Sequence, residues 1–234
     1  MPEGIAEGIG ASVRRKEDKK FTTGKGRYTD DINRPGQLHA FFIRSNVAHA
    51  KINDIDITKA LKSDGVAAIY TGADIAADGV GGPICGWTPT NRDGSAPKEP
   101  PHPLLANGKV RYVGDHIAVV IAESMEQAKS AAENVKIDLE NLAPVVDLST
   151  AIGNTQIHDE MDDNVYFDWE LGDEKATADA LGSATKVIEL TVTNNRVIPN
   201  AMEPRAAVAE YDETSESYTL YTSSQNPHLT RLVM

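Results

Sequence analysis

The sequence predicts an α/β (α+β) fold in two domains, and three observations support this prediction. The chain has 234 residues, enough for one large domain or two small ones that each bury a core. Residues 117–139 have the pattern of a strand, a helix and a strand in close succession. Residues 187–223 contain runs that alternate apolar and polar residues, as half-buried strands do.

The first half of the chain begins with a charged arm and continues as short, closely spaced elements. Residues 1–20 are glycine-rich and then highly charged, so we expect an extended N-terminal arm. Residues 52–57 alternate as a half-buried strand, and residues 58–70 indicate a short helix, a stop at Gly65 and a buried strand. The core of this half is expected from the apolar segments 38–43, 66–70, 117–122 and 135–139.

The clearest unit lies between residues 109 and 140. Ile117 to Ala122 is an uninterrupted apolar run, Ser124 and Gln127 form a capping box, and residues 136–140 alternate again. A strand, a helix and a strand joined this closely predict a right-handed crossover and layered α/β packing.

Two segments lack periodicity. Residues 78–103 are rich in glycine and proline, which predicts a long surface loop. Residues 141–173 are acidic and weakly patterned, which predicts a connection between two domains. Beyond them we expect a helix at 174–181, strands at 186–195, 206–212 and 217–224, and a hairpin turn at 212–216.

The last residues begin another helix. Asn226 is a suitable N-cap, Pro227 suits the first helical position, and apolar residues follow at helical spacing up to Met234. Because no capping residue follows, we expect the chain to be the opening portion of a larger enzyme subunit.

Composition argues against several classes of protein. There are 35 acidic and 23 basic residues, and the net charge of -12 disfavours binding to nucleic acid. Cys85 is the only cysteine, so we expect no disulfide and no cysteine-ligated zinc or iron–sulfur site in this chain. No run of about eighteen apolar residues is present, and Arg14 and Arg15 precede no apolar stretch, so we expect a cytoplasmic protein without a transmembrane segment.

Short motifs add no chemistry by themselves. The glycine clusters at 4–10, 24–26 and 79–86 lack the strand and helix that give phosphate-binding loops their meaning. No two of the six histidines are three or four residues apart, so no metal site is expected. Residue chemistry alone therefore indicates an acidic two-domain α/β chain and leaves its activity open.

Several stretches, taken in order, resemble the large subunit of the molybdenum hydroxylases, the family of xanthine dehydrogenase, aldehyde oxidase and aerobic carbon monoxide dehydrogenase. The N-terminal part follows that subunit's pattern R-x-E-D, G-x-G-x-Y-x-x-D, R-S and A-H-A-R-I, with Lys51 in place of the last arginine. The remaining matches are VRYVGDHIAVVIAE, VKIDLENLAPVVD, WELGD, MEPRAAVAEYD and SSQNPH. RRKEDKKFTTGKGRYTDDI and WELGD favour the branch of the carbon monoxide dehydrogenase large chain.

The resemblance implies an α/β hammerhead domain followed by the truncated start of the molybdenum-cofactor-binding domain. The domains expected are an N-terminal arm at 1–20, the hammerhead at 21–140, a connecting segment at 141–173 and an incomplete molybdopterin-binding domain at 174–234.

The resemblance also implies site residues. A family glutamine that approaches the molybdenum oxo ligand corresponds to Gln225, where an amide NH₂ can donate without adding charge. Without the resemblance, Gln225 would be taken for a strand-end amide that caps the next helix. Glu203, in MEPR, corresponds to a position near the active-site wall, and an ion pair with Arg205 is the alternative role. The family's catalytic glutamate has no counterpart among these residues.

The implied cofactors and partners follow from the same resemblance. Molybdenum with molybdopterin, as the cytosine dinucleotide, would belong to the complete subunit, and none is expected on this chain alone. FAD and [2Fe–2S] clusters would be carried by a medium and a small partner subunit in a dimer of heterotrimers. The reaction would be hydroxylation with water-derived oxygen.

Two alternatives stay open at this point. The chain could be a non-catalytic scaffold or assembly subunit of a split molybdenum enzyme, in which case the missing cofactor loops belong to another chain. It could also be an unrelated α/β binding module whose loops match the family motifs by chance.

Overall fold

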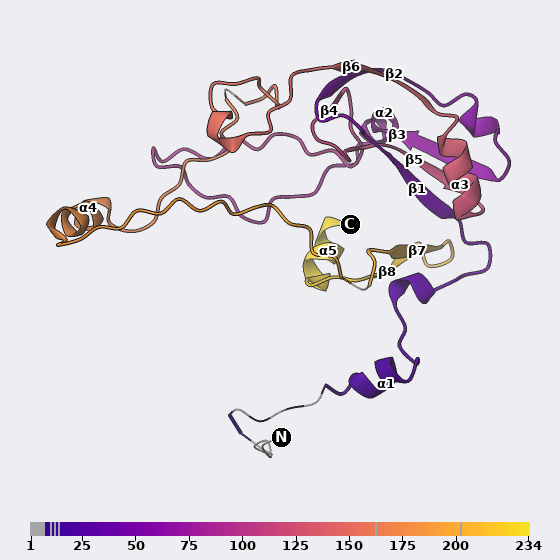
Figure 1. The fold of residues 1–234 in the computed structure, drawn as a ribbon. Coiled ribbons are helices and arrows are strands. Elements are labelled where there is room, and N and C mark those ends of the chain that lie inside the picture. The colour runs from indigo at the N-terminus through magenta and orange to yellow at the C-terminus, as the bar shows by residue number, and fades with distance from the viewer. Residues whose placement is uncertain (1–7, 10, 12, 14, 162, 202) are drawn as a thin grey trace. The chain divides into compact units, whose positions relative to one another are not determined.

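The computed structural model describes residues 8–9, 11, 13, 15–161, 163–201 and 203–234 (Figure 1). The chain divides into two compact units. One unit covers residues 36–192. The other combines the chain before residue 36 with nearly all of the chain after residue 192.

The first sheet of unit 36–192 is built around strand β5 (His116–Ala122). β1 (His39–Arg44) pairs with one edge of β5 and β3 (Val66–Thr71) with the other, both antiparallel. Four consecutive residues of β5, from Ile117 to Val120, are buried, as expected for a strand covered on both faces. The apolar run in the sequence therefore marks the centre of the sheet.

The second sheet has the order β4-β2-β6 and is also antiparallel. β2 (Ala50–Asp56) lies between β4 (Lys109–Val110) and β6 (Lys136–Asn141). β6 alternates half-buried and exposed residues over Lys136–Glu140, which confirms the alternation expected for residues 136–140.

Helix α3 (Met125–Ala132) connects the two sheets. The Ser124 hydroxyl accepts a hydrogen bond from the Gln127 backbone N–H at 3.2 Å, so the predicted N-cap is confirmed. The predicted crossover is wrong, because β5 and β6 belong to different sheets and every strand pair is antiparallel. Figure 1 shows α3 beside the strands of the first sheet. The fold is α+β.

Two buried clusters form the core of this unit. One joins Ile69 and Val120 to the small helix residues Ala128 and Ala131, and the other is centred on Val110 and Ile117. All four expected core segments contribute residues to these clusters or pack against them.

The remaining elements of this unit are short. η2 (Ala60–Lys62) and α2 (Gly72–Ala77) flank β3, and Gly65 adopts φ +71°, which confirms the expected stop. No helix or strand lies between α2 and β4, as the loop prediction for 78–103 requires. Further along are η3 (Leu148–Thr150) and α4 (Glu174–Ser183), whose N-cap is Asp173.

The alternating segment 186–195 differs from the prediction. Its residues form no strand, and all are exposed, including Ile188, Leu190 and Val192. An alternating pattern indicates a half-buried strand only where a neighbouring strand supplies hydrogen bonds, and this segment pairs with no strand in the described part of the chain.

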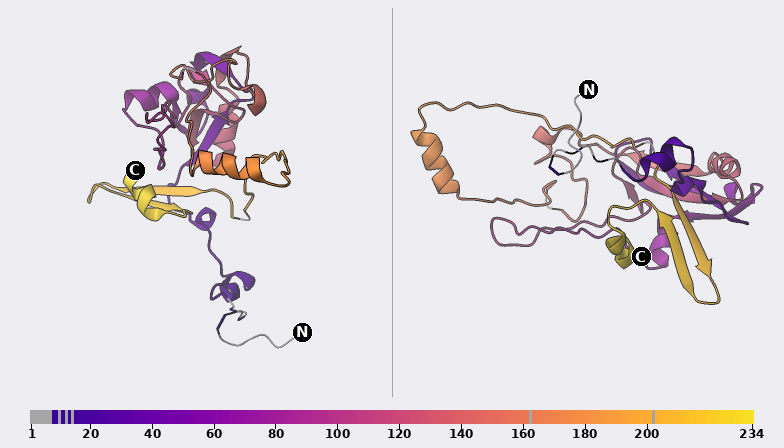
Figure 2. Two further views of the ribbon diagram at one scale, coloured as in Figure 1. Left: turned by 90° about the vertical axis from the view of Figure 1, so that its left-hand side faces the viewer. Right: turned by 90° about the horizontal axis from the view of Figure 1, so that it is seen from below.

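The other unit contains the expected hairpin. β7 (Ala207–Asp212) pairs antiparallel with β8 (Ser217–Thr222) in a hairpin (Figure 2). The Asp212 carboxylate accepts hydrogen bonds from the backbone N–H groups of Thr214 and Ser215 in the turn. Arg34 bonds to Glu210 on β7, and its guanidinium lies 5.1 Å from the Tyr221 ring centroid. α5 (Pro227–Val233) follows with the expected cap Asn226.

The N-terminal part is not wholly extended. α1 (Asp18–Thr22) is a five-residue helix that begins inside the expected arm, and η1 (Thr29–Asp31) follows it. The rest of the arm before residue 15 lies largely outside the described residues. Within the described ranges, no helix has the length and apolar character needed to cross a membrane.

We expect truncation of a core isoleucine to lower stability far more than truncation of an isoleucine in the exposed segment. Ile117 is 1% exposed and Ile188 is 80% exposed. In the 234-residue chain, Ile117→Ala should lower the free energy of unfolding by about 2–5 kcal/mol, because it leaves a cavity between the packed strands. Ile188→Ala should change it by less than about 0.5 kcal/mol. Urea unfolding followed by circular dichroism measures both, and equal effects would contradict this placement of the core.

Candidate functional site

Gln225 lies in the short connection between β8 and α5. β8 ends at Thr222 and α5 begins at Pro227, so Gln225 occupies a bend immediately before a helix N-terminus. The Asn226 side chain accepts a hydrogen bond from the Leu229 backbone N–H at 3.2 Å, and the Ser224 hydroxyl accepts one from the Asn226 N–H at 3.1 Å. The residues on either side of Gln225 therefore fix the bend.

The Gln225 side chain does not cap the helix that follows it. Asn226 caps the helix, whereas the exposed Gln225 amide makes no hydrogen bond to a described residue. An amide held on a fixed bend and left without a partner can donate its NH₂ group to a bound group. This arrangement fits the cofactor contact that the sequence implies.

Glu203 lies just before β7 and is half-buried. In the described part of the chain, no ion pair joins Glu203 to Arg205. Ala207 pairs with Thr222 at the open end of the hairpin. Glu203 precedes β7 and Gln225 follows β8, so both lie in the chain segments just beyond that end. The hairpin thus brings the chain segments of both residues to one end of the unit.

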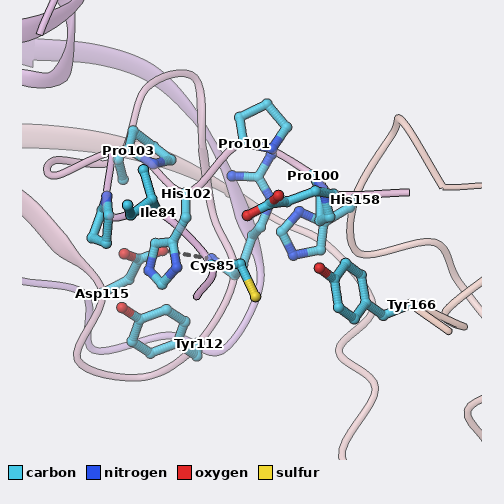
Figure 3. Close-up of a pocket in the computed structure, with 14 residues that line it drawn as sticks. Ile84, Cys85, Pro100, Pro101, His102, Pro103, Tyr112, Asp115, His158 and Tyr166 are labelled. Atoms are coloured by element: carbon cyan, nitrogen blue, oxygen red, sulfur yellow. Dashed lines mark hydrogen bonds between the residues drawn. The ribbon is translucent and has the colours of Figure 1, made fainter. Parts of the chain in front are cut away.

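A pocket of about 350 Å³ lies in unit 36–192, and sequence reasoning missed it. Its walls come from residues 83–85 and 99–103, together with Ala106, Arg111, Tyr112, Asp115, His158 and Tyr166. In Figure 3, His158 and Tyr166 lie on one side, His102, Tyr112 and Asp115 lie on the other, and Cys85 lies between them. These segments are far apart in sequence, so no pattern of neighbouring residues predicts the pocket.

The loop that forms one wall is held in place by specific contacts. A Cβ on Gly82 would lie 1.8 Å from the His102 carbonyl oxygen, so only glycine permits the two loop segments to approach this closely. The Arg92 Nε–H group donates to both carboxylate oxygens of Asp168, at 3.0 and 3.1 Å, and the Arg92 backbone N–H donates to the Asp168 carbonyl oxygen at 2.8 Å. The loop 83–103 is thereby tied to the chain around residue 168.

Three polar atoms at this pocket are buried without a partner among the described residues: Arg111 Nε, His158 Nδ1 and the Tyr166 hydroxyl. Burial and the positive charge of Arg111 lower the pKa of His158, so its imidazole is neutral at pH 7. Burial, with Asp115 nearby, raises the pKa of Tyr112. The pocket therefore presents an arginine cation, the neutral polar groups of His158 and Tyr166, and the carboxylates of Glu99 and Asp115.

No cluster that could hold a metal ion is found where the structure is described. No group of three or more His, Cys, Asp or Glu side chains converges there. The exposed Cys85 thiol donates to the Trp87 carbonyl oxygen at 2.9 Å.

Comparison with protein families places this chain in context. Residues 23–143 match a family model described as "Aldehyde oxidase and xanthine dehydrogenase, a/b hammerhead domain". Residues 157–234 match one described as "Molybdopterin cofactor-binding domain". The order of these matches is the order implied by the sequence motifs.

Over the aligned residues, the chain is about one-third identical to curated relatives. The nicotine 6-hydroxylase large subunit of Paenarthrobacter nicotinovorans is 35% identical over 229 residues, which is 97% of this chain and 27% of that protein. The carbon monoxide dehydrogenase large chain of Afipia carboxidovorans is 34% identical over 244 residues, which is 97% of this chain and 29% of that protein. The chain thus spans less than a third of each relative.

Solved structures give the same result. A Cu,Mo-CO dehydrogenase crystal structure superposes with a TM-score of 0.81 and 31% identity, covering 97% of this chain and 29% of that one. Quinoline 2-oxidoreductase from Pseudomonas putida 86 superposes with a TM-score of 0.77 and 34% identity, and the match covers 93% of this chain and 27% of that one.

His158, in the pocket, should make the free energy of unfolding depend on pH. Because the folded state holds His158 with a lowered pKa, it binds fewer protons than the unfolded state, whose histidine pKa is about 6.5. The free energy of unfolding should therefore fall as the pH drops from about 7.5 to about 5.5. His158→Gln should reduce this loss, and the exposed-residue control His228→Gln should leave it unchanged. Urea unfolding across this range tests the expectation, and an unchanged slope in His158→Gln would contradict it.

Proposed function

This chain belongs to the aldehyde oxidase and xanthine dehydrogenase family, and we propose that it forms the N-terminal portion of the large subunit of a molybdenum hydroxylase. The proposal is carried by one observation: a hammerhead match and a molybdopterin-binding match follow each other and together cover residues 23–143 and 157–234. The family consists of molybdenum oxidoreductases such as the carbon monoxide dehydrogenase large chain. We propose the same domain limits as the sequence motifs imply, with the hammerhead at 21–140, a connection at 141–173 and the cofactor domain beginning at 174.

The reaction class proposed is hydroxylation of a substrate carbon with oxygen derived from water. When bound, the molybdenum cofactor supplies the redox chemistry and accepts the two electrons that leave the substrate. The identities to the nicotine hydroxylase and the carbon monoxide dehydrogenase chains are nearly equal, so they do not favour one substrate.

Within this chain, Gln225 is the residue proposed to hold the cofactor. Its amide is exposed and makes no hydrogen bond to a described residue, and the capped N-terminus of α5 fixes the backbone on its C-terminal side. A neutral amide NH₂ can donate to an oxygen of the cofactor without adding charge. Glu203, at the same end of the β7–β8 hairpin, is proposed to lie along the wall of that site.

The whole enzyme is proposed to need further chains. Its electrons would pass to [2Fe–2S] clusters and FAD on a small and a medium subunit, its cofactor would be the cytosine dinucleotide of molybdopterin, and it would act in the cytoplasm as a dimer of heterotrimers. Several relatives are named as subunits of larger enzymes, among them the gamma subunit of a 6-hydroxypseudooxynicotine dehydrogenase complex. The 234 residues alone are proposed to be inactive, since they correspond to 27–29% of the two relatives described above.

A second candidate is a non-catalytic assembly subunit of a split molybdenum enzyme. The observation that favours it is the exposed apolar face of residues 186–195, which would become buried against a partner strand. Affinity purification from the native source distinguishes the two. A separate chain carrying a glycine-rich cofactor loop would support the assembly subunit, and a single polypeptide that contains both would support the fragment.

Isotope labelling tests the reaction class itself. The complete enzyme that contains these residues should contain molybdenum and should place oxygen from isotopically labelled water into its product. Incorporation from labelled molecular oxygen instead would refute a hydroxylase of this family.

Gln225→Ala should impair turnover in the complete enzyme. Losing one donor at a reacting centre lowers kcat by about 100-fold or more, and Gln225→Glu should be at least as damaging because it replaces the NH₂ donor with a charge. The control is Glu213→Gln, an exposed change in the hairpin turn. Turnover is measured per molybdenum, so that cofactor loss is not mistaken for a catalytic defect. Full turnover of Gln225→Ala at full molybdenum content would refute this role.

A further inference from the structure

We propose that the pocket between residues 83–115 and residues 158–166 binds a small carboxylic acid anion with a short apolar body. This inference does not depend on the proposed function. We call it the proline pocket, after Pro83, Pro100, Pro101 and Pro103 in its walls.

The first support is a set of buried polar atoms that form no hydrogen bond of acceptable geometry with a described residue: Arg111 Nε, His158 Nδ1 and the Tyr166 hydroxyl. Burial and the neighbouring Cys85 thiol raise the pKa of Tyr166, so its hydroxyl is protonated and can donate, and neutral His158 can donate from Nδ1 in one of its two tautomers. A buried polar group without a partner costs about 1–3 kcal/mol, and more when it is charged. A ligand that accepts hydrogen bonds could satisfy these groups, and the two oxygens of a carboxylate can accept several at once.

Arg111 is placed to form the charged part of the contact. One guanidinium nitrogen reaches the Lys109 carbonyl oxygen at 3.5 Å, which leaves Nε for a ligand. Its backbone N–H donates to the Asp115 carboxylate at 3.0 Å, so the backbone of the residue is fixed. The planar guanidinium that this backbone carries matches the geometry of a planar carboxylate.

The walls select the rest of the ligand. Ile84 and the four prolines give the pocket an apolar lining, and its volume of about 350 Å³ falls in the range typical of small-molecule sites. Inorganic phosphate or sulfate would leave these walls without contacts. A carboxylate attached to a small ring or a short alkyl chain satisfies both the donors and the walls.

The two carboxylates of the lining do not oppose an anion at this position. Asp115 already accepts the Arg111 backbone N–H and lies across the pocket from His158 and Tyr166 (Figure 3). Glu99 is exposed, so solvent screens its charge.

The pocket draws on both family matches. Arg111 belongs to the segment matched as a hammerhead domain, whereas His158 and Tyr166 belong to the segment matched as a molybdopterin-binding domain. Both sides lie within unit 36–192. A bound acid would therefore also fix the chain around residues 158–166 against the hammerhead sheet.

Benzoate is a suitable probe, and benzamide is its uncharged counterpart of the same shape. The only two tryptophans of the chain report on the site, because Trp87 contacts both Trp169 and Phe167, with ring centroids 5.7 and 5.6 Å apart. Phe167 contacts Tyr166 at 5.6 Å. In the 234-residue chain, benzoate should bind saturably by calorimetry and change the tryptophan fluorescence, and benzamide should bind at least about tenfold more weakly.

Two variants and two controls assign this binding to the pocket. Arg111→Gln should abolish saturable binding, and Tyr166→Phe should weaken it at least about fivefold. The exposed-residue changes Arg27→Gln and Tyr218→Phe should bind benzoate as the unchanged chain does. If circular dichroism shows that Arg111→Gln does not fold, Tyr166→Phe decides. Equal affinity for benzoate and benzamide, unweakened binding by Tyr166→Phe, or no saturable binding up to about 10 mM benzoate would each overturn the proposal.

Discussion

The burial of β5 is the constraint on which the rest of unit 36–192 depends. A strand with four consecutive buried residues needs neighbours on both edges and cover on its faces, since an unpaired backbone group away from water is costly. β1 and β3 supply the edges, and the alanines of α3 allow the helix to approach closely. The turn that leads into β5 carries Arg111, Tyr112 and Asp115, so the same constraint positions one wall of the proline pocket.

Local sequence was sufficient to predict most individual elements but not their pairing. The caps Ser124 and Asn226 and the turn glycine Gly65 were all identified correctly, because each acts through neighbours in the sequence. The crossover from β5 to β6 was wrong, because the choice of sheet is made by distant strands. Both strands found antiparallel partners earlier in the chain, β1 for β5 and β2 for β6. No short-range pattern contains that information.

The two candidate sites also differ in whether neighbouring residues or distant ones determine them. The fixed bend around Gln225 follows from local residues, but the role assigned to that glutamine comes only from the family resemblance, and the structure adds an exposed amide that makes no hydrogen bond to a described residue. The proline pocket could not be predicted at all. Its donors lie at 111, 158 and 166, and only folding brings them to one cavity. The proline-rich loop was identified as a surface loop, while its second role as a wall depends on the Arg92–Asp168 contact.

Residues 186–195 have the alternating sequence of a half-buried strand but no neighbouring strand to pair with in the described part of the chain. Burying an aliphatic side chain such as Ile188, Leu190 or Val192 contributes about 1.5–3 kcal/mol, and pairing the strand would also satisfy its backbone groups. The segment 36–141 needs no such addition, because its two sheets already bury their own apolar faces. A partner strand, from any source, would therefore stabilise residues 186–195 far more than the two sheets of segment 36–141. The order of residues 186–195 is thus expected to depend on assembly, whereas the stability of the two sheets is not.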